Sequence, residues 1–163
     1  MAGVATLGGP AAEAVHFGPM EAGYAYVEKG DLDSALREFK KAIAIAPNDT
    51  RGQFGIGYIY LKWEEPTLAI PYLKTAFEVA HPGDRTGRLN AAVTLAEAYS
   101  MIGDPDHAVA WLREGRLWFE QLGWAEEGWR QRLAGPSFEA LKRDSRYQEL
   151  ARGKADPLEK PER

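Results

Sequence analysis

Small and apolar residues recur at helical spacing through the central part of the chain. In the stretch DLDSALREFKKAIAI they occupy Leu32, Ala35, Leu36, Phe39, Ala42 and Ile43. Positions three and four apart lie on one face of a helix, so the stretch predicts an amphipathic helix with one buried face. Asp31 precedes the helix and can cap it, and Gly30 marks a turn before it.

The same pattern returns twice further along the chain. GYAYVEKGDLDSALREFKKAIAIAPND aligns with GYIYLKWEEPTLAIPYLKTAFEVAHPGD at an offset of 34, and AEAYSMIGDPDHAVAWLREG follows at an offset of 39. The matched positions hold a small residue, an aromatic, a small residue, a large apolar residue and a small residue. In chain order they are Gly23, Tyr26, Ala35, Phe39 and Ala42; Gly57, Tyr60, Ala69, Leu73 and Ala76; and Ala96, Tyr99, Ala108, Leu112 and Gly115. The five extra residues before the third copy are expected in HPGDRTGR, residues 81–88.

This pattern resembles the tetratricopeptide repeat (TPR), a helix–turn–helix unit of about 34 residues. The resemblance covers residues 16 to 118 and implies an all-α fold. The expected architecture is a right-handed superhelix of three TPR helix–turn–helix units plus short C-terminal capping helices. The expected divisions are an N-terminal extension, three units within 16–121, capping helices and a disordered tail, at 1–15; 16–49, 50–83 and 89–121; 122–153; and 154–163.

Prolines and turn residues indicate where the helices of these units begin and end. Proline closes the first two units at Pro47 and Pro82, whereas the third has none, so its second helix is expected to run on. Asp104, which follows the turn residue Gly103, is expected to cap that helix. Pro71 is expected near the start of the second helix of the second unit, where a proline removes no helical hydrogen bond.

The stretch GQFGIGYIY, residues 52–60, has the glycine content of a phosphate-binding loop. No predicted strand precedes it and no Gly-Lys-Ser/Thr follows it, which argues against a nucleotide site. The repeat register makes it the first helix of the second unit, with Gly57 where two helices cross. Gly52 and Gly55 are less favourable inside a helix, and either close packing or simple tolerance explains them; Gly52→Ala is expected to be neutral or mildly stabilising.

Composition narrows the function further. The chain has 163 residues, 45% hydrophobic and 27% charged, with no cysteine and a net charge of −4. The absence of cysteine excludes disulfides and thiolate metal sites, and the negative charge argues against nucleic acid as a partner. No apolar run is long enough to span a bilayer and the N-terminus is a poor signal peptide, so the expected location is the cytoplasm.

Candidate catalytic chemistry is sparse. The histidines His16, His81 and His107 are not at metal-ligand spacing. Glu64 and Glu65 are sequence neighbours, which point in different directions on a helix and form no catalytic pair. No nucleophile elbow is present. We therefore expect no enzyme activity, no cofactor and no metal.

The resemblance implies that the first helix of each unit lines a concave groove. The residues expected to face it, and so to bind a protein or peptide partner, are Phe17, Met20, Tyr24, Arg51, Phe54, Tyr58, Leu61, Asn90, Val93, Glu97 and Met101. A mostly apolar groove suits an amphipathic helix or an extended apolar peptide. TPR proteins that clamp chaperone tails bind a carboxylate with basic residues; their positions hold Met20, Tyr24, Gly55, Asn90 and Thr94 here, so that subtype is rejected. Packing of the groove against the chain's own residues 1–15 stays an alternative.

Aromatic residues crowd the segment after the third unit. Trp118, Phe119, Trp124 and Trp129 either seal the last repeat or form a second docking surface, for a protein or for peripheral contact with a membrane. The next segment, GPSFEALKRDSRYQELARG, resembles the segment that closes TPR arrays in some bacterial regulatory proteins. Its matching residues are Phe138, Leu141, Asp144, Arg146, Tyr147 and Leu150, and Ser145 with Gln148 is expected to form a capping box.

Together these features predict a non-catalytic adaptor or scaffold, bacterial in type, that binds a protein partner in the groove. The alternative is an accessory subunit built into a larger complex through the C-terminal aromatic residues.

Overall fold

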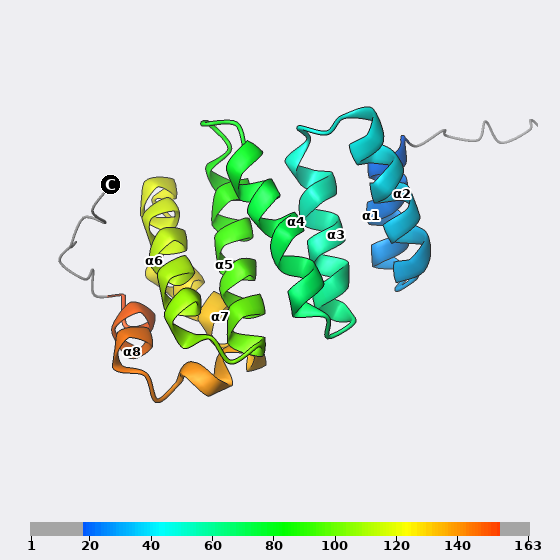
Figure 1. Ribbon diagram of the computed structural model, residues 1–163. Helices are drawn as coiled ribbons and strands as arrows, with labels where there is room; N and C mark the ends of the chain where they lie inside the picture. The colour runs from blue at the N-terminus through cyan, green and yellow to red at the C-terminus, as the bar shows by residue number, and fades with distance from the viewer. Residues whose placement is uncertain (1–17, 154–163) are drawn as a thin grey trace, which may run out of the picture.

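Paired antiparallel helices make up the computed structural model, which describes residues 18–153. The helices in chain order are α1 Pro19–Glu28, α2 Leu32–Ile45, α3 Thr50–Lys62, α4 Pro66–Val79, α5 Arg85–Met101, α6 Pro105–Leu122, α7 Glu126–Leu133, the 3₁₀ helix η1 Pro136–Leu141 and α8 Ser145–Ala151. Figure 1 shows the pairs α1/α2, α3/α4 and α5/α6 side by side in one row, with α7 and α8 at the C-terminal end. No strand occurs in residues 18–153. The fold is therefore the all-α TPR superhelix that the sequence predicted. Phe17 and the segments 1–15 and 154–163 lie outside the described residues.

Glycines let the helices approach closely in the first two units. The ring of Phe39 is fully buried between α1 and α3. A Cβ built on Gly23 would lie 2.6 Å from Cε1 of this ring, and one built on Gly55 would lie 2.6 Å from Cε2. Gly57 stands in the same relation to the Leu73 side chain, also at 2.6 Å. The three glycine positions are therefore places where a large side chain of a neighbouring helix fills the volume of a missing Cβ.

Gly52 corrects one sequence prediction. It is buried on α3, and a Cβ there would lie 2.6 Å from Cγ2 of Ile43 and 3.3 Å from Cε of Met20. The Gly52→Ala change predicted to be harmless would thus force α2 and α3 apart or displace Ile43. Helix propensity favours alanine by only about 1 kcal/mol, which is smaller than the cost of overpacking a close helix contact.

Aspartates cap the N-termini of five helices, α2, α3, α5, α6 and α8. The side chains of Asp31, Asp49, Asp84, Asp104 and Asp144 accept a hydrogen bond from a backbone N–H in the first turn, at 2.8 to 3.1 Å. The caps predicted at Asp31 and Asp104 are confirmed. The capping box at Ser145 is wrong, because α8 already begins at Ser145 and Asp144 caps it.

The turns inside the three units share one backbone conformation. Gly30 and Gly103 adopt the left-handed region, with φ of 76° and 75°. Glu64 occupies the equivalent place in the second unit, with φ of 59°. A residue with a Cβ is strained in this region, so Glu64 is a local weak point of the second turn.

Pro71 does not lie in the first turn as predicted. It is the sixth residue of α4, so the carbonyl of Thr67 loses its usual amide donor. Both residues are exposed, which leaves that carbonyl accessible to water. The exposed face of α4 therefore tolerates the proline.

The third unit has five more residues before its repeat positions than the second, and most of them lengthen its first helix, α5. α5 has 17 residues where α3 has 13, and the connection from α4 to α5 is one residue longer than that from α2 to α3. α6 also runs on as predicted, to 18 residues against 14 for α2.

The C-terminal helices seal the open end of the third unit. Trp129 is fully buried, its ring centroid lies 5.4 Å from that of Phe119, and its Nε1 donates to the carbonyl of Leu150 at 2.8 Å. The hydroxyl of Tyr147 donates to the carbonyl of Leu133 at 2.6 Å. Phe119 and Trp129 are 1% and 0% exposed, so the structure places them in the core and not on the second surface predicted as one alternative.

Candidate functional site

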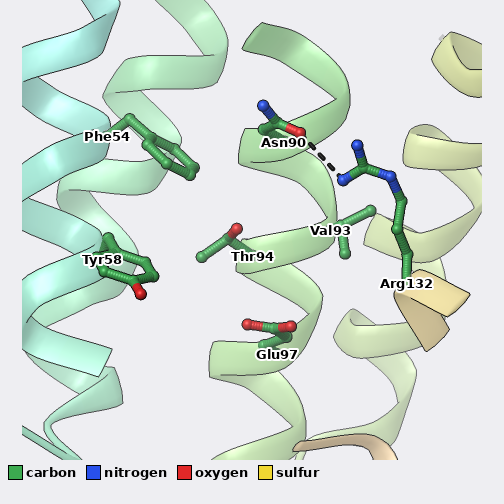
Figure 2. Close-up of a pocket in the computed structure, with 7 residues that line it drawn as sticks. All are labelled: Phe54, Tyr58, Asn90, Val93, Thr94, Glu97 and Arg132. Carbon is green, nitrogen blue, oxygen red and sulfur yellow. Dashed lines mark hydrogen bonds between the residues drawn. The ribbon is translucent and has the colours of Figure 1, made fainter. Parts of the chain in front are cut away.

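A cleft of about 290 Å³ opens between α3, α5 and α7. Its lining residues are Phe54, Tyr58, Asn90, Val93, Thr94, Glu97 and Arg132 (Figure 2). Five of them, all but Thr94 and Arg132, are groove residues that the sequence predicted from helical spacing. The repeat register therefore brings the predicted residues of the second and third units into one cleft.

One wall of the cleft is aromatic and comes from α3. Phe54 and Tyr58 are four residues apart, so their rings stack one above the other on one face of the helix (Figure 2). Both are half-buried. The Nζ of Lys62 lies 5.1 Å from the centroid of the Tyr58 ring, one turn further along the helix. This wall offers a ligand two aromatic faces with a positive charge at one end.

The opposite wall is polar and comes from α5. Asn90, Val93, Thr94 and Glu97 recur at intervals of three and four residues and so share one face of the helix. Burial raises the pKa of Glu97 above its ordinary value, while the positive charge of Lys62 acts in the opposite direction. No hydrogen bond or ion pair to the Glu97 carboxylate is present within residues 18–153. The cleft thus holds a carboxylate with free acceptor capacity.

Arg132 enters the cleft from the C-terminal helix α7. Its Nη1 donates to Oδ1 of Asn90 at 3.1 Å, and its guanidinium lies 5.5 Å from the centroid of the Trp124 ring. Burial lowers the pKa of Arg132. Arg132 was not among the predicted groove residues, because α7 lies outside the repeat register and folds back against α5.

The remaining predicted groove residues lie outside this cleft. Met20 is 7% exposed and belongs to the core of the first unit, where it packs beside Gly52. Leu61 is half-buried and packs on the core of the second and third units. Met101 is exposed at the far end of α5. These three positions therefore contribute packing or an isolated surface and not a shared pocket.

Tyr24 and Arg51 form a separate edge between α1 and α3. The ring of Tyr24 meets Phe39 edge-on at a centroid distance of 5.1 Å, and its hydroxyl lies 3.5 Å from the carbonyl of Arg51. Burial raises the pKa of Tyr24. Arg51 is paired with Asp49 at 2.7 Å. The positive charge of Arg51 is therefore paired with the nearby Asp49 carboxylate.

Comparisons with known proteins bear on the repeats directly. The family model described as TPR repeat matches residues 23–62, and the one described as tetratricopeptide repeat matches residues 50–80. Residues 23–80 carry tetratricopeptide repeats. TPR repeats in general present extended concave surfaces that mediate protein–protein interaction.

Relatives and solved structures agree with this assignment. The chain is 30% identical over 98 residues to aspartyl/asparaginyl beta-hydroxylase of Mus musculus, and 35% identical over 83 residues to cellulose synthase 2 operon protein C of Komagataeibacter xylinus. These matches cover 60% and 51% of this chain but only 12% and 6% of the relatives. The N-terminal domain of stress-induced protein-1 (STI-1) from C. elegans has a similar fold, with a TM-score of 0.58 and 18% identity, covering 81% of this chain and 91% of that one.

Residues 18–153 contain no group of three or more His, Asp or Glu side chains arranged to hold a metal ion. Within the same residues, no helix combines the length and the apolar character that a membrane span requires.

Proposed function

We propose that this chain is a non-catalytic adaptor that binds a segment of a partner protein in the cleft between α3 and α5. The observation that supports this most is the pair of half-buried rings, Phe54 and Tyr58, that line the cleft, with Phe54 also packed on the core. Aromatic side chains bury a large area and lose little entropy when they are immobilised, which makes them common anchors of protein interfaces.

The cleft also has the form of a binding site for a peptide and not for a reaction. It combines aromatic faces with a few polar groups at its ends, which fixes the position of a ligand without a nucleophile or an acid–base pair. Glu97 is the only carboxylate among its lining residues, and no histidine or cysteine lines it. These features favour recognition over catalysis.

A second function receives weaker support. Trp124 is 43% exposed, next to the cleft residue Arg132, and is the part of the C-terminal aromatic segment that a partner can reach. An accessory subunit that docks through this segment would use Trp124 together with the half-buried Trp118. The two readings make different residues essential, so one experiment separates them.

Site-specific photo-crosslinking tests the proposal. A benzophenone amino acid is placed at position 58 in the cleft, or at the control position 63, where Trp63 is an exposed aromatic at the end of the same helix. We expect position 58 to crosslink a discrete partner and position 63 to crosslink it far less. Crosslinking to that partner at position 124 but not at position 58 would contradict the groove and favour the second function.

A further inference from the structure

Two charged side chains in the cleft, Arg132 and Glu97, form no direct ion pair within residues 18–153, although Lys62 attracts Glu97 from a longer distance. Arg132 bonds the neutral amide of Asn90, and no carboxylate pairs with it within residues 18–153. Other arginines in the same part of the chain are paired, for example Arg116 with Glu126 at 2.6 Å and Arg146 with Asp144 at 2.6 Å. The positive charge of Arg132 is therefore left for something outside the described fold.

Glu97 is the negative counterpart. Its carboxylate accepts no hydrogen bond within residues 18–153, although burial on α5 disfavours its charged form. Partly buried charges without hydrogen-bond partners destabilise a fold, so their presence calls for a function. The two unsatisfied charges line the same cleft (Figure 2).

The two charges lie at opposite ends of the cleft. The Arg132 guanidinium is held at the level of Asn90 by its hydrogen bond. Glu97 is seven residues further along α5, which is two helical turns or about 10 Å. Val93 lies between them on α5, and the rings of Phe54 and Tyr58 lie across the cleft on α3 (Figure 2). The cleft thus has the Arg132 guanidinium at one end, apolar side chains along its walls, and the Glu97 carboxylate at the other end, where Lys62 offsets part of the negative charge.

We infer that the cleft selects an extended partner segment that carries an acidic side chain, an apolar or aromatic residue, and a basic side chain, in that spatial order. The acidic group would pair with Arg132 and the basic group with Glu97. An extended chain advances about 3.1 to 3.4 Å per residue, so the two charged residues would be about three positions apart. This inference rests on the proposed function, because it defines the ligand of the same cleft.

The arrangement explains selectivity as well as affinity. A segment with the charges reversed would bring an acidic group to Glu97 and a basic group to Arg132, and like charges in a partly dry cleft repel. An entirely apolar segment would cover both charges without satisfying them. The pair therefore fixes the direction in which a segment can bind.

A displayed library of random nonapeptides tests the inference, with the full chain as bait. We expect enrichment of peptides that combine an acidic and a basic residue about three positions apart, with an apolar residue between them. The affinity of one enriched peptide is then measured by fluorescence anisotropy for the wild type, for Arg132→Gln and for Glu97→Gln. Arg130→Gln is the control, because Arg130 is exposed on the same helix and pairs with Glu127.

We expect each of the two cleft variants to bind about ten-fold more weakly or worse, since each variant removes a hydrogen bond to a charged group. A peptide whose acidic residue is replaced by its amide should bind the wild type about as weakly as the original peptide binds Arg132→Gln. The same replacement should cause no further loss of affinity for Arg132→Gln. This second arm changes the peptide alone, so it holds even if a protein variant folds poorly.

The outcomes separate the inference from the proposed function. Enriched peptides that need Tyr58 but bind Arg132→Gln and Glu97→Gln at full strength would overturn the inference and leave the adaptor function intact. Enriched peptides that bind Tyr58→Ala at full strength, or a library from which nothing is enriched, would contradict both.

Discussion

Phe39 lies between two glycines on neighbouring helices, and this geometry decides what each glycine tolerates. Its ring is fully buried, with Gly23 against one edge and Gly55 against the other. The ring cannot move away from a new Cβ at Gly55 without meeting Gly23. Ile43, which faces Gly52, is only half-buried and has more freedom to shift.

We therefore predict that Gly55→Ala lowers the free energy of unfolding by about 1–3 kcal/mol, through overpacking. Gly52→Ala should also destabilise, by a smaller amount. The matched control is Gly135→Ala: Gly135 has a φ of −64° and no atom within 4 Å of its built Cβ, so alanine should be neutral or mildly stabilising. Chemical denaturation measures all three. A Gly55→Ala variant as stable as the wild type would contradict the close packing described here.

Glu64 is the residue-scale weak point of the second unit. We predict that Glu64→Gly stabilises the protein, because glycine removes left-handed strain of about 1–2 kcal/mol and loses part of that gain through a more flexible unfolded chain. The net increase in the free energy of unfolding should be up to about 1 kcal/mol. Glu65→Gly, at the neighbouring position without a positive φ, should instead destabilise. Thermal melts of the two variants check the sign of each change.

The raised pKa of Glu97 predicts how the stability of the fold changes with pH. Its pKa is raised in the folded protein, so the favourable contribution of its protonated form is present at low pH and is lost as the pH rises through the folded pKa. Lys62 is the cationic group that acts on Glu97 and reduces the shift, whereas Arg132 lies at the opposite end of the cleft, beside Asn90. Glu97→Gln, which cannot ionise, should therefore melt at a higher temperature than the wild type at pH 7.

Below pH 4.5, the ordinary pKa of the side chain, the two proteins should melt alike. Melting curves between pH 4 and pH 7 provide the measurement. A difference in Tm that shrinks as the pH rises would contradict a carboxylate destabilised by burial.

At the scale of elements, α7, η1 and α8 hold the third unit closed. Trp129 packs on Phe119 of α6 and bonds the backbone of α8, so one side chain joins three helices. Arg116 of α6 adds ion pairs to Glu120 and to Glu126 at the start of α7. The C-terminal helices are thus an integral part of the repeat core and not an appended surface.

We predict that Trp129→Ala destabilises the protein by about 3–5 kcal/mol, the range for a buried aromatic truncated to alanine. Trp124→Ala should cost much less, because Trp124 is 43% exposed and meets Phe119 only at its edge. Trp118→Ala should destabilise the protein by an intermediate amount, since Trp118 is half-buried and its Nε1 donates to Glu114 at 2.9 Å. Equal losses in the free energy of unfolding for Trp124→Ala and Trp129→Ala would contradict this description of the C-terminal packing.

At the scale of the whole molecule, the repeat register explains what could be predicted from sequence. The offsets that align Gly23, Gly57 and Ala96 place six helices and also put Phe54, Tyr58, Asn90, Val93 and Glu97 on inward faces. Spacing along a helix is a local property, which sequence displays directly.

What sequence could not predict depends on contacts between distant segments. Arg132 reaches the cleft because α7 folds back onto α5, an approach that no periodicity encodes. Met20 is buried rather than presented to the groove, because Gly52 allows α1 and α3 to come close. The tolerance assigned to Gly52 failed for the same reason: helix propensity describes one helix, whereas the cost of a methyl group depends on its neighbour.

The binding affinity of Tyr58→Ala for the partner identified by crosslinking tests the central claim most directly. Tyr58 faces the cleft and not the core, so its truncation should leave the circular dichroism spectrum unchanged and weaken binding by about 2 kcal/mol, or roughly thirty-fold. Trp63→Ala on the same helix should bind like the wild type. Full-strength binding by Tyr58→Ala, together with loss of binding by a folded Trp124→Ala variant, would contradict the groove as the partner site.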